Sequence, residues 1–600
     1  MLRPHRLLLE LVGCYLLIGL GASLAIPPWQ APDEPAHLEY ARILQLGASN
    51  PAAVEQPIIA SLYTFHFWEQ RRIDPPVRVP QSLAAPELRL FRQIDKAPGY
   101  YYLAAWVSSW TADPVLQLYS IRWLSVVLSA LTIPLAYFTA RQLLPPARAR
   151  LALVAAALVA FLPMYAYIGA AMNPDNLGAP LAAAAILLAV GALRGRRPIP
   201  TALGALALAV LAFVARRSTI ALVPWTLLAL GACVLGWMWQ RLARPVALAL
   251  TTLGGGVALM AIAWPGDAAA GWYAVGPPWG ATRSARFAYE GTHSLRIAYA
   301  AGVQQATLVH SLPDPRVRAL LGRQVLLDAA VRTADGTVRG YLALERDTAS
   351  AAVAPFVATP RWQHVQLSYT VPITTQHLYI TLAAASPGEL FFDRIRLLDG
   401  QTARPAVQLS NESAEQPFLW WQQRLADRRV VQYVTRIIQV ARDGVYSSSE
   451  ARALYPLFLY QLFSSLYGRF GWMHFGLSDS FYLAVGLACA VLLSGLGRAR
   501  RRASGLEAGQ RRALAWLALL VLMAVATLLL EYTPYLNART YPQGRYLFPV
   551  LPAIACLLVS GCAQLLPARW DGHGALAAVG VLIALDLWSW AGVIVPFFYG

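Results

Sequence analysis

The chain is dominated by long uninterrupted runs of apolar residues. A helix rises about 1.5 Å per residue, so roughly 20 apolar residues cross the hydrocarbon core of a bilayer. Runs of about this length occur at 7–26, 118–141, 151–171, 177–193, 199–215, 218–239, 245–264, 479–497, 511–531, 546–566 and 574–597. Charged residues make up 13% of the chain, against roughly 25% in soluble domains. The sequence therefore predicts a polytopic α-helical membrane protein with about eleven transmembrane helices.

The basic residues indicate how the chain is oriented. The net charge is +18, and Lys96 is the only lysine, so arginine supplies nearly all of the positive charge. With the N-terminus inside, the arginines cluster in successive inside segments, as the positive-inside rule requires. The outer turn at Arg216 and Arg217 is the exception. A cleaved signal peptide ending at 23–25 is the alternative reading of the first run, and it leaves the other orientations unchanged.

Two large segments lie between the runs on the predicted outer side. The first outer loop, 27–117, is polar and aromatic, and the second outer segment covers 265–478. Within the second, 272–400 alternates apolar and polar residues at period two, as in 365–369 and 378–382, which predicts an inserted antiparallel β-sandwich over 265–402. Residues 403–478 are expected to form amphipathic helices on the outer membrane surface. Two apolar stretches, 97–111 and 453–469, are read as interfacial or re-entrant helices because they are rich in aromatic residues.

These boundaries divide the chain into four parts. They are an N-terminal transmembrane module (1–264), the sandwich (265–402), the outer helices (403–478) and the C-terminal transmembrane helices (479–600). The segments 291–296, 361–363 and 392–397 resemble those of carbohydrate-binding jelly-roll modules. Such folds also serve as plain spacers, so glycan binding and spacing both remain open for the sandwich.

The most distinctive local motif follows the first apolar run directly. Residues 32–40 read Pro-Asp-Glu-Pro-Ala-His-Leu-Glu-Tyr, which places the adjacent carboxylates of Asp33 and Glu34 at the edge of the membrane. Ionisable groups near a low-dielectric boundary are candidates for function. One carboxylate suits a general base, and its neighbour suits a hydroxyl or metal ligand. The alternative is that Asp33 merely caps a helix that Pro35 begins.

An apolar span followed by this motif resembles the first outer loop of the GT-C superfamily of membrane glycosyltransferases. The resemblance is closest to a bacterial family of uncharacterised multi-pass proteins related to protein O-mannosyltransferases and aminoarabinose transferases. Matching segments occur at 96–103, at Arg122, and at 161–163, 173–176 and 542–549. Segment 96–103 departs from the family's Pro-Pro-Leu-Tyr-Tyr pattern at Gly99. The sandwich at 265–402 has no counterpart in that family and looks inserted.

The resemblance implies roles for individual residues. A sugar would pass from a polyprenyl-phosphate carrier to an acceptor on the outer face, with Asp33 as the base and with Glu34 and Asp175 as supporting acids. Substrate-binding residues would come from the same motifs, namely His37, Tyr101, Asn173, Gln543 and Tyr546. His37, four residues after Asp33, equally suits the stabilisation of one helix face. A divalent ion, Mg²⁺ or Mn²⁺, remains open.

The chemistry of the departing group calls for positive charge. A lipid phosphate that leaves an anomeric carbon is stabilised by cations, and a guanidinium matches a phosphate with two parallel hydrogen bonds. Arg545, Arg216 and Lys96 lie on the predicted outer side and are candidates for binding the donor phosphate. Ordinary snorkelling of these side chains to the membrane surface is the alternative.

Together these features predict an inverting membrane glycosyltransferase in the cytoplasmic (inner) membrane of a bacterium, with its N-terminus inside and its sandwich outside. The expected partners are a polyprenyl-phosphate sugar donor and a glycan, lipid or protein acceptor. No phosphate-binding glycine loop is present for a nucleotide-sugar donor, and the arginine pattern suits topology better than nucleic acid. Two other classes remain open: a transporter or flippase of lipid-linked glycans, and a non-catalytic sugar-binding receptor.

Overall fold

A computed structural model gives the structure of the chain. It describes residues 3–47, 51–71, 74–76, 79–80, 82–83, 98–195, 197–241, 265–269, 272–275, 281–299, 307–312, 314–346, 349–375, 378–409, 411–419, 449–501, 506–532 and 543–600. The chain divides into two compact units. The transmembrane unit comprises Met1–Leu242 and Leu454–Gly600, and the sandwich unit comprises Ala243–Ala453.

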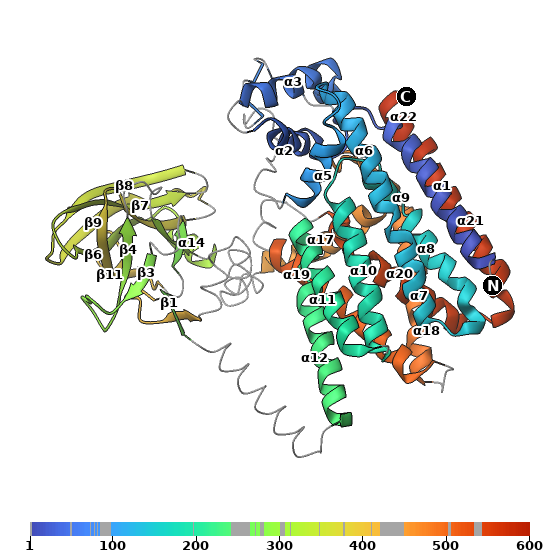
Figure 1. Cartoon of the computed structure of the whole chain (residues 1–600). Helices are drawn as coiled ribbons and strands as arrows, with labels where there is room; N and C mark the ends of the chain where they lie inside the picture. The colour runs from blue at the N-terminus through green and yellow to red at the C-terminus, as the bar shows by residue number, and fades with distance from the viewer. Residues whose placement is uncertain are drawn as a thin grey trace. The chain divides into compact units, whose positions relative to one another are not determined.

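The transmembrane unit is a bundle of long helices with short helices gathered at one end (Figure 1). The short helices are α2 (Glu34–Leu46), α3 (Pro51–Thr64), α4 (Phe67–Gln70) and α5 (Gly99–Val107). The remaining α-helices are α1 (Arg3–Ala25), α6 (Pro114–Ala130), α7 (Thr132–Leu143), α8 (Ala152–Ala160), α9 (Pro163–Gly169), α10 (Asp175–Leu193), α11 (Pro198–Ala215), α12 (Leu222–Arg241), α17 (Ser449–Gly468), α18 (Asp479–Arg501), α19 (Ala508–Tyr532), α20 (Leu551–Leu565), α21 (Asp571–Ser589) and α22 (Val595–Tyr599). Tighter or wider turns form η2 (Pro146–Leu151), η3 (Arg217–Thr219), η7 (Gly544–Val550), η8 (Ala568–Trp570) and η9 (Trp590–Ile594).

Within the described part of the chain, nine helices are long and apolar enough to cross a membrane. They are His5–Ala25, Pro114–Leu143, Asp175–Leu193, Pro198–Ala215, Arg217–Arg241, Asp479–Arg498, Ala508–Leu529, Gly544–Leu565 and Ala568–Tyr599. A tenth span results if the pair Pro146–Ala160 and Pro163–Gly169, bent by 60°, is counted as one. Every predicted run except 245–264 coincides with one of these, and 245–264 lies outside the described residues. The stretches predicted to be interfacial form α5 and α17.

Small side chains let the helices of the bundle approach closely. Alanines spaced three or four residues apart line the facing sides of α10 and α11, and they are almost fully buried; they are Ala182, Ala185, Ala189, Ala205, Ala209 and Ala212. Leu203 and Leu211 on α11 are more than half exposed and point away from this contact. Small residues inside and leucines outside are typical of helices that pack together in lipid, where close backbone contact replaces the hydrophobic effect.

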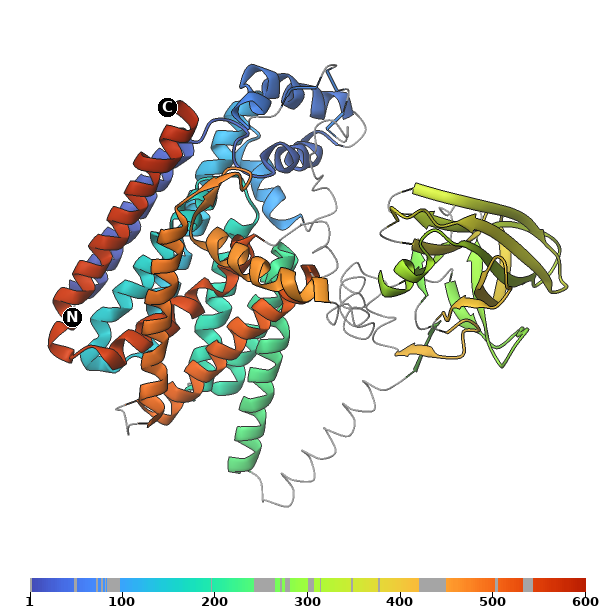
Figure 2. The ribbon, with the colours of Figure 1, turned by 180° about the vertical axis from the view of Figure 1, so that it is seen from behind.

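A β-hairpin lies at the same end of the bundle as the short helices (Figure 2). It is formed by β14 (Arg469–Phe470) and β15 (Phe475–Gly476). At its tip, Trp472 contacts Phe67 of α4, with ring centroids 6.0 Å apart. The guanidinium of Arg71 lies 4.1 Å from the Trp472 ring. The C-terminal half of the chain therefore helps to hold the first outer loop.

The sandwich unit consists of two antiparallel sheets that share one apolar core. The first sheet has the order β2 (Tyr273–Val275), β5 (Thr307–Leu312), β10 (Leu378–Ala384), β7 (Val338–Arg346) and β8 (Ala349–Ala358). The second has the order β3 (Ala281–Ser284), β4 (Ser294–Tyr299), β11 (Gly388–Asp399), β6 (Gln324–Thr333) and β9 (Gln363–Thr370), with β12 (Pro405–Val407) paired to β11. Outside these sheets, β1 (Pro265–Ala269) pairs with β13 (Pro417–Leu419), and α14 (Asp314–Leu320) follows β5.

The period-two pattern of the sequence is the reason for this core. In β6, Val325, Leu327, Ala329 and Val331 are fully buried, because alternate side chains of a strand point to the same face. The predicted fold class, a helical membrane protein with an antiparallel β-domain, is confirmed. One boundary differs: β12 and β13 lie beyond 402, in the segment expected to be helical, since β12 continues the sheet beside β11. Residues 420–448 of that segment lie outside the described residues.

Candidate active site

Asp33 lies at the turn between α1 and α2, where the backbone is strained. Its φ angle is 66° and its ψ angle 5°, a left-handed conformation that few residues other than glycine adopt. Pro35 occupies the first turn of α2, as expected, but the Asp33 side chain makes no capping hydrogen bond to that helix. Its Oδ2 instead accepts a hydrogen bond of 2.9 Å from Arg545 Nη2. Backbone strain of this kind is often found at functional sites.

Arg545 is held in place by the close packing of η7 against α17. Gly544 N donates to Ser465 Oγ at 2.7 Å, and a Cβ on Gly544 would lie 2.0 Å from the backbone nitrogen of Leu466. Only glycine allows this contact. Arg545 is 2% exposed, and its Nε and Nη1 have no hydrogen-bond partner within the described residues. The side chain is therefore a buried cation whose Nε and Nη1 groups can still donate hydrogen bonds.

A second acid and arginine meet beside the first pair. Asp175 begins α10, and its backbone N–H donates to Asn173 Oδ1 at 2.9 Å. Arg216 Nε lies 2.5 Å from Asp175 Oδ1, and Nη2 donates to Oδ2 at 3.3 Å. The Arg216 side chain crosses α10 at Gly178, where a Cβ would come within 2.8 Å of it. Both members of this pair are more than nine-tenths buried.

Tyr546 connects the two pairs. Its ring lies 5.6 Å from the guanidinium carbon of Arg216 and 5.7 Å from that of Arg545. Arg545 also interacts electrostatically with both Asp33 and Asp175. Residues from the first outer loop, from α10, from the turn after α11 and from η7 thus meet in one place. This is the convergence that the sequence predicted for Asp33, Asp175, Arg216 and Arg545.

Tyr101 and His37 form the neighbouring wall. Tyr101 OH and His37 Nδ1 are 2.8 Å apart, and the rings of Tyr101 and Tyr40 are 4.3 Å apart. Burial raises the pKa of the Tyr101 phenol well above its usual range, although the charge of Arg216 opposes the shift. The hydroxyl group therefore stays protonated and is able to donate a hydrogen bond at physiological pH. It lies within the electrostatic influence of Asp33 as well.

Glu34 has a different environment from Asp33. Arg122 donates to both of its carboxylate oxygens, at 2.8 and 2.7 Å. Both side chains are fully buried. Arg122 also donates to three backbone carbonyls, that of Ser23 in the last turn of α1 and those of Ile26 and Pro27 in the turn that follows. This arrangement fixes the turn that carries Asp33, so Glu34 is placed to position that residue.

The remaining predicted site residues are distributed as follows. Gln543 immediately precedes η7, and its Oε1 is buried without a hydrogen-bond partner within the described residues. Asn173 holds the start of α10, as described above. Lys96 lies outside the described residues. No group of three or more His, Cys, Asp or Glu side chains suited to a metal ion occurs in the part of the chain that the structure describes.

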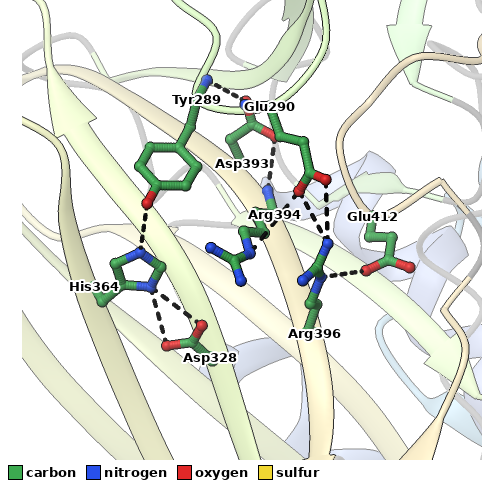
Figure 3. Close-up of polar contacts among 8 residues, drawn as sticks. All are labelled: Tyr289, Glu290, Asp328, His364, Asp393, Arg394, Arg396 and Glu412. Atoms are coloured by element: carbon green, nitrogen blue, oxygen red, sulfur yellow. Dashed lines mark hydrogen bonds and ion pairs between the residues drawn. The ribbon is translucent and has the colours of Figure 1, made fainter. Parts of the chain in front are cut away.

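A second polar cluster covers the outer face of the six-stranded sheet in the sandwich unit (Figure 3). His364 lies between Asp328, 3.1 Å from Nδ1, and the hydroxyl of Tyr289, 3.1 Å from Nε2. The sequence pattern marked nearby segments without showing that these residues meet. Burial raises the pKa of Asp393 even though backbone N–H groups of Tyr289, Glu290 and Arg394 donate to it. Arg396 bonds Glu290 and Glu412.

Similarity to known proteins divides between the two units. The search of curated proteins gives no match. Among solved structures, a family 22 carbohydrate-binding module of Clostridium thermocellum Xyn10B is 17% identical, and the alignment covers 22% of this chain and 88% of that chain with a TM-score of 0.19. A xylan-binding domain of Paenibacillus barcinonensis Xyn10C is 19% identical, over 22% of this chain and 86% of that chain, again with a TM-score of 0.19.

Residues 95–264 match a family described as dolichyl-phosphate-mannose-protein mannosyltransferase. The matched region contains Tyr101, Asp175 and Arg216, which the structure brings together with Asp33 and Arg545. This match, and a bundle of candidate membrane spans, support a membrane glycosyltransferase of the GT-C superfamily.

Proposed function

We propose that the chain transfers a sugar from a polyprenyl-phosphate donor to a glycan, lipid or protein acceptor on the extracytoplasmic side of a bacterial inner membrane. The reaction is an inverting displacement. Asp33 takes the proton of the acceptor hydroxyl, the acceptor oxygen bonds the anomeric carbon, and the bond from that carbon to the phosphate oxygen breaks. The polyprenyl phosphate leaves with the bonding electron pair.

The observation that carries this proposal is the contact between Asp33 and Arg545. It joins an acid of the first outer loop to a cation 512 positions later in the chain, at 2.9 Å. In an inverting displacement the base for the acceptor and the cation for the departing phosphate act from opposite sides of one anomeric carbon, so both must belong to the same cavity. Arg216 completes the cationic side, and its guanidinium lies over the ring of Tyr546.

The other predicted residues take supporting roles. Asp175 orients Arg216 and balances its charge, and Glu34 positions the turn through Arg122. The hydroxyl groups of Tyr101 and Tyr546 and the polar atoms of His37, Asn173 and Gln543 would bind sugar or acceptor. A divalent ion stays a prediction. Asp33 and Asp175, the acids that could hold it, are each paired with an arginine.

The test is transfer by the purified protein in lipid nanodiscs, with polyprenyl-phosphate sugars as donors. Asp33→Asn should lose transfer by roughly 10²–10⁴-fold, the range typical of a missing general base. Asp74→Asn is the matched control, because Asp74 belongs to the same outer loop and is exposed. Equal activity of the Asp33 and Asp74 variants would overturn the assignment. Movement of lipid-linked glycan across vesicles without transfer would favour a flippase instead.

A further inference from the structure

The proposed base and the proposed phosphate-binding cation are bonded to each other in this structure. Asp33 Oδ2 accepts from Arg545 Nη2. An arginine bonded to a carboxylate stabilises its charged form and so makes it a weaker proton acceptor. In this arrangement Asp33 is poorly prepared to take the proton of an acceptor hydroxyl. The bond between Arg545 and Asp33 must therefore break before Asp33 can accept the proton.

Arg545 has the donors needed to bind a second anion. A guanidinium carries five N–H groups, and here the Nε and Nη1 groups are buried without partners within the described residues. Leaving donors of a buried charged group unused is costly. Nε and Nη1 lie on different edges of the guanidinium, so each can donate to a phosphate oxygen separately. Two parallel bonds also need Nη2, as in the Nε and Nη2 bonds of Arg122 to Glu34. A phosphate can therefore dock on Arg545 while Nη2 still holds Asp33.

The two acid–arginine pairs differ in how firmly they are held. Arg216 meets both carboxylate oxygens of Asp175, through Nε at 2.5 Å and Nη2 at 3.3 Å. Arg545 meets Asp33 through a single nitrogen at 2.9 Å. The Asp33 side chain is also the more accessible of the two acids, at 17% exposed against 1% for Asp175. Of the two pairs, Asp33–Arg545 is the one that is easier to separate.

The charges of the reaction favour an exchange. The two acids and two arginines balance, so an arriving phosphodiester adds one negative charge to a neutral set. During transfer Asp33 gains a proton and loses its charge, while the departing phosphate gains negative charge. As the proton moves to Asp33, the attraction between Asp33 and Arg545 weakens. At the same time the attraction between Arg545 and the departing phosphate strengthens. Tyr546 lies against both guanidinium groups and provides a surface along which Arg545 can shift.

We propose that Arg545 is exchanged between Asp33 and the donor phosphate, so that donor binding releases Asp33 to act as base. This inference rests on the proposed function and adds an order of events to it. The donor binds first and the acceptor second. An acceptor that arrives alone meets an acid that is still bonded to arginine, which keeps the base inactive until a donor is present.

Initial-rate kinetics of the wild-type protein test the order without any substitution. Polyprenyl phosphate, the product, should compete with the donor and should not compete with the acceptor. Acceptor alone should show no saturable binding at concentrations near its KM. Competition of polyprenyl phosphate with both substrates, or tight binding of acceptor alone, would exclude the ordered scheme.

The pH profile tests the exchange itself. The profile of kcat/KM for the donor reports groups in the free enzyme, and that of kcat reports groups in the complex. The acidic limb should lie at higher pH in kcat than in kcat/KM, because Asp33 loses its arginine on donor binding. Among the described residues, the other charged or titratable groups of this site are His37, Tyr101, Asp175, Arg216 and Tyr546. Coincident limbs in the wild type would overturn the exchange.

Substitutions at Arg545 provide the second test. Arg545→Gln should raise the donor KM about 10- to 100-fold, as expected for lost hydrogen bonds to a charged group, and should bring the two acidic limbs together. Arg545→Lys keeps the charge and should recover part of the donor affinity. Arg498→Gln removes an exposed arginine and serves as the control. If Asp33→Asn abolishes transfer but the limbs coincide in the wild type, the exchange is wrong and the proposed function stands.

Discussion

The buried pair formed by Glu34 and Arg122 allows the sharpest prediction about stability. Glu34→Gln keeps the shape of the side chain and removes its charge. Arg122, which is fully buried, would then lack a counter-charge, although its bonds to backbone carbonyls remain. Breaking a buried ion pair on one side costs about 3–5 kcal/mol. We expect the thermal midpoint of the protein to fall by about 4–6 °C, because a unit of this size has an unfolding entropy of about 0.8 kcal/mol/K.

The assay is thermal unfolding in detergent at a fixed scan rate, since membrane proteins often unfold irreversibly. Glu507→Gln is the matched control. Glu507 pairs with Arg194 at 2.9 Å, close to the 2.7 Å between Glu34 and Arg122, but the Glu507 side chain is 70% exposed. An exposed pair contributes about 0–1 kcal/mol, so the control should shift the midpoint by little. Glu34→Gln combined with Arg122→Met should recover part of the loss. If the Glu34 and Glu507 variants behave alike, the pair does not fasten the turn.

Further predictions concern packing, the site and pH. Gly544→Ala should cost about 1–3 kcal/mol and lower transfer, because its Cβ would meet the α17 backbone; unfolding and activity are measured together, and a silent variant would contradict the packing argument. Tyr101→Phe removes the hydroxyl bonded to His37 and should raise a substrate KM by about 3- to 10-fold, whereas an unchanged KM would place Tyr101 outside the binding surface. In the sandwich unit, partial burial opposes ionisation of Glu415, but hydrogen bonds from Thr292 and His293 outweigh it and lower its pKa. A carboxyl group whose pKa is depressed in the folded protein adds stability above its unfolded pKa of about 4.3, and this stability is lost as the pH falls through the folded pKa. The protection factor of the Thr292 amide, which is its exchange rate corrected for the intrinsic pH dependence, should therefore fall on acidification, and Glu415→Gln should remove that dependence.

The positions of the spans could be predicted because hydropathy has a local cause. A helix in lipid satisfies its own backbone hydrogen bonds, so an apolar run of sufficient length is enough to specify it. The run 151–171 predicts one span and does not predict the sharp break between α8 and α9, where Pro163 begins α9. The sandwich core was predictable for the same reason, through the alternation seen in β6.

The contacts inside the site could be predicted only in part. Acids and arginines in separate motifs were expected to converge, but no local pattern tells which acid meets which arginine. The sequence places Arg122 at the opening of a span and does not indicate its bond to Glu34, which joins residues 88 positions apart. The pairing depends on how α6 packs against the turn after α1. That packing is a property of the whole bundle, and a single sequence does not display it.

The left-handed backbone at Asp33 decides which replacements separate chemistry from folding. Asparagine tolerates this conformation nearly as well as glycine does and keeps the outline of aspartate. Alanine or a β-branched residue would add conformational strain of about 1–2 kcal/mol at the same position. A scan with alanine would therefore merge two kinds of damage at this one residue. Of these replacements, only Asp33→Asn reports what the carboxylate contributes as a base.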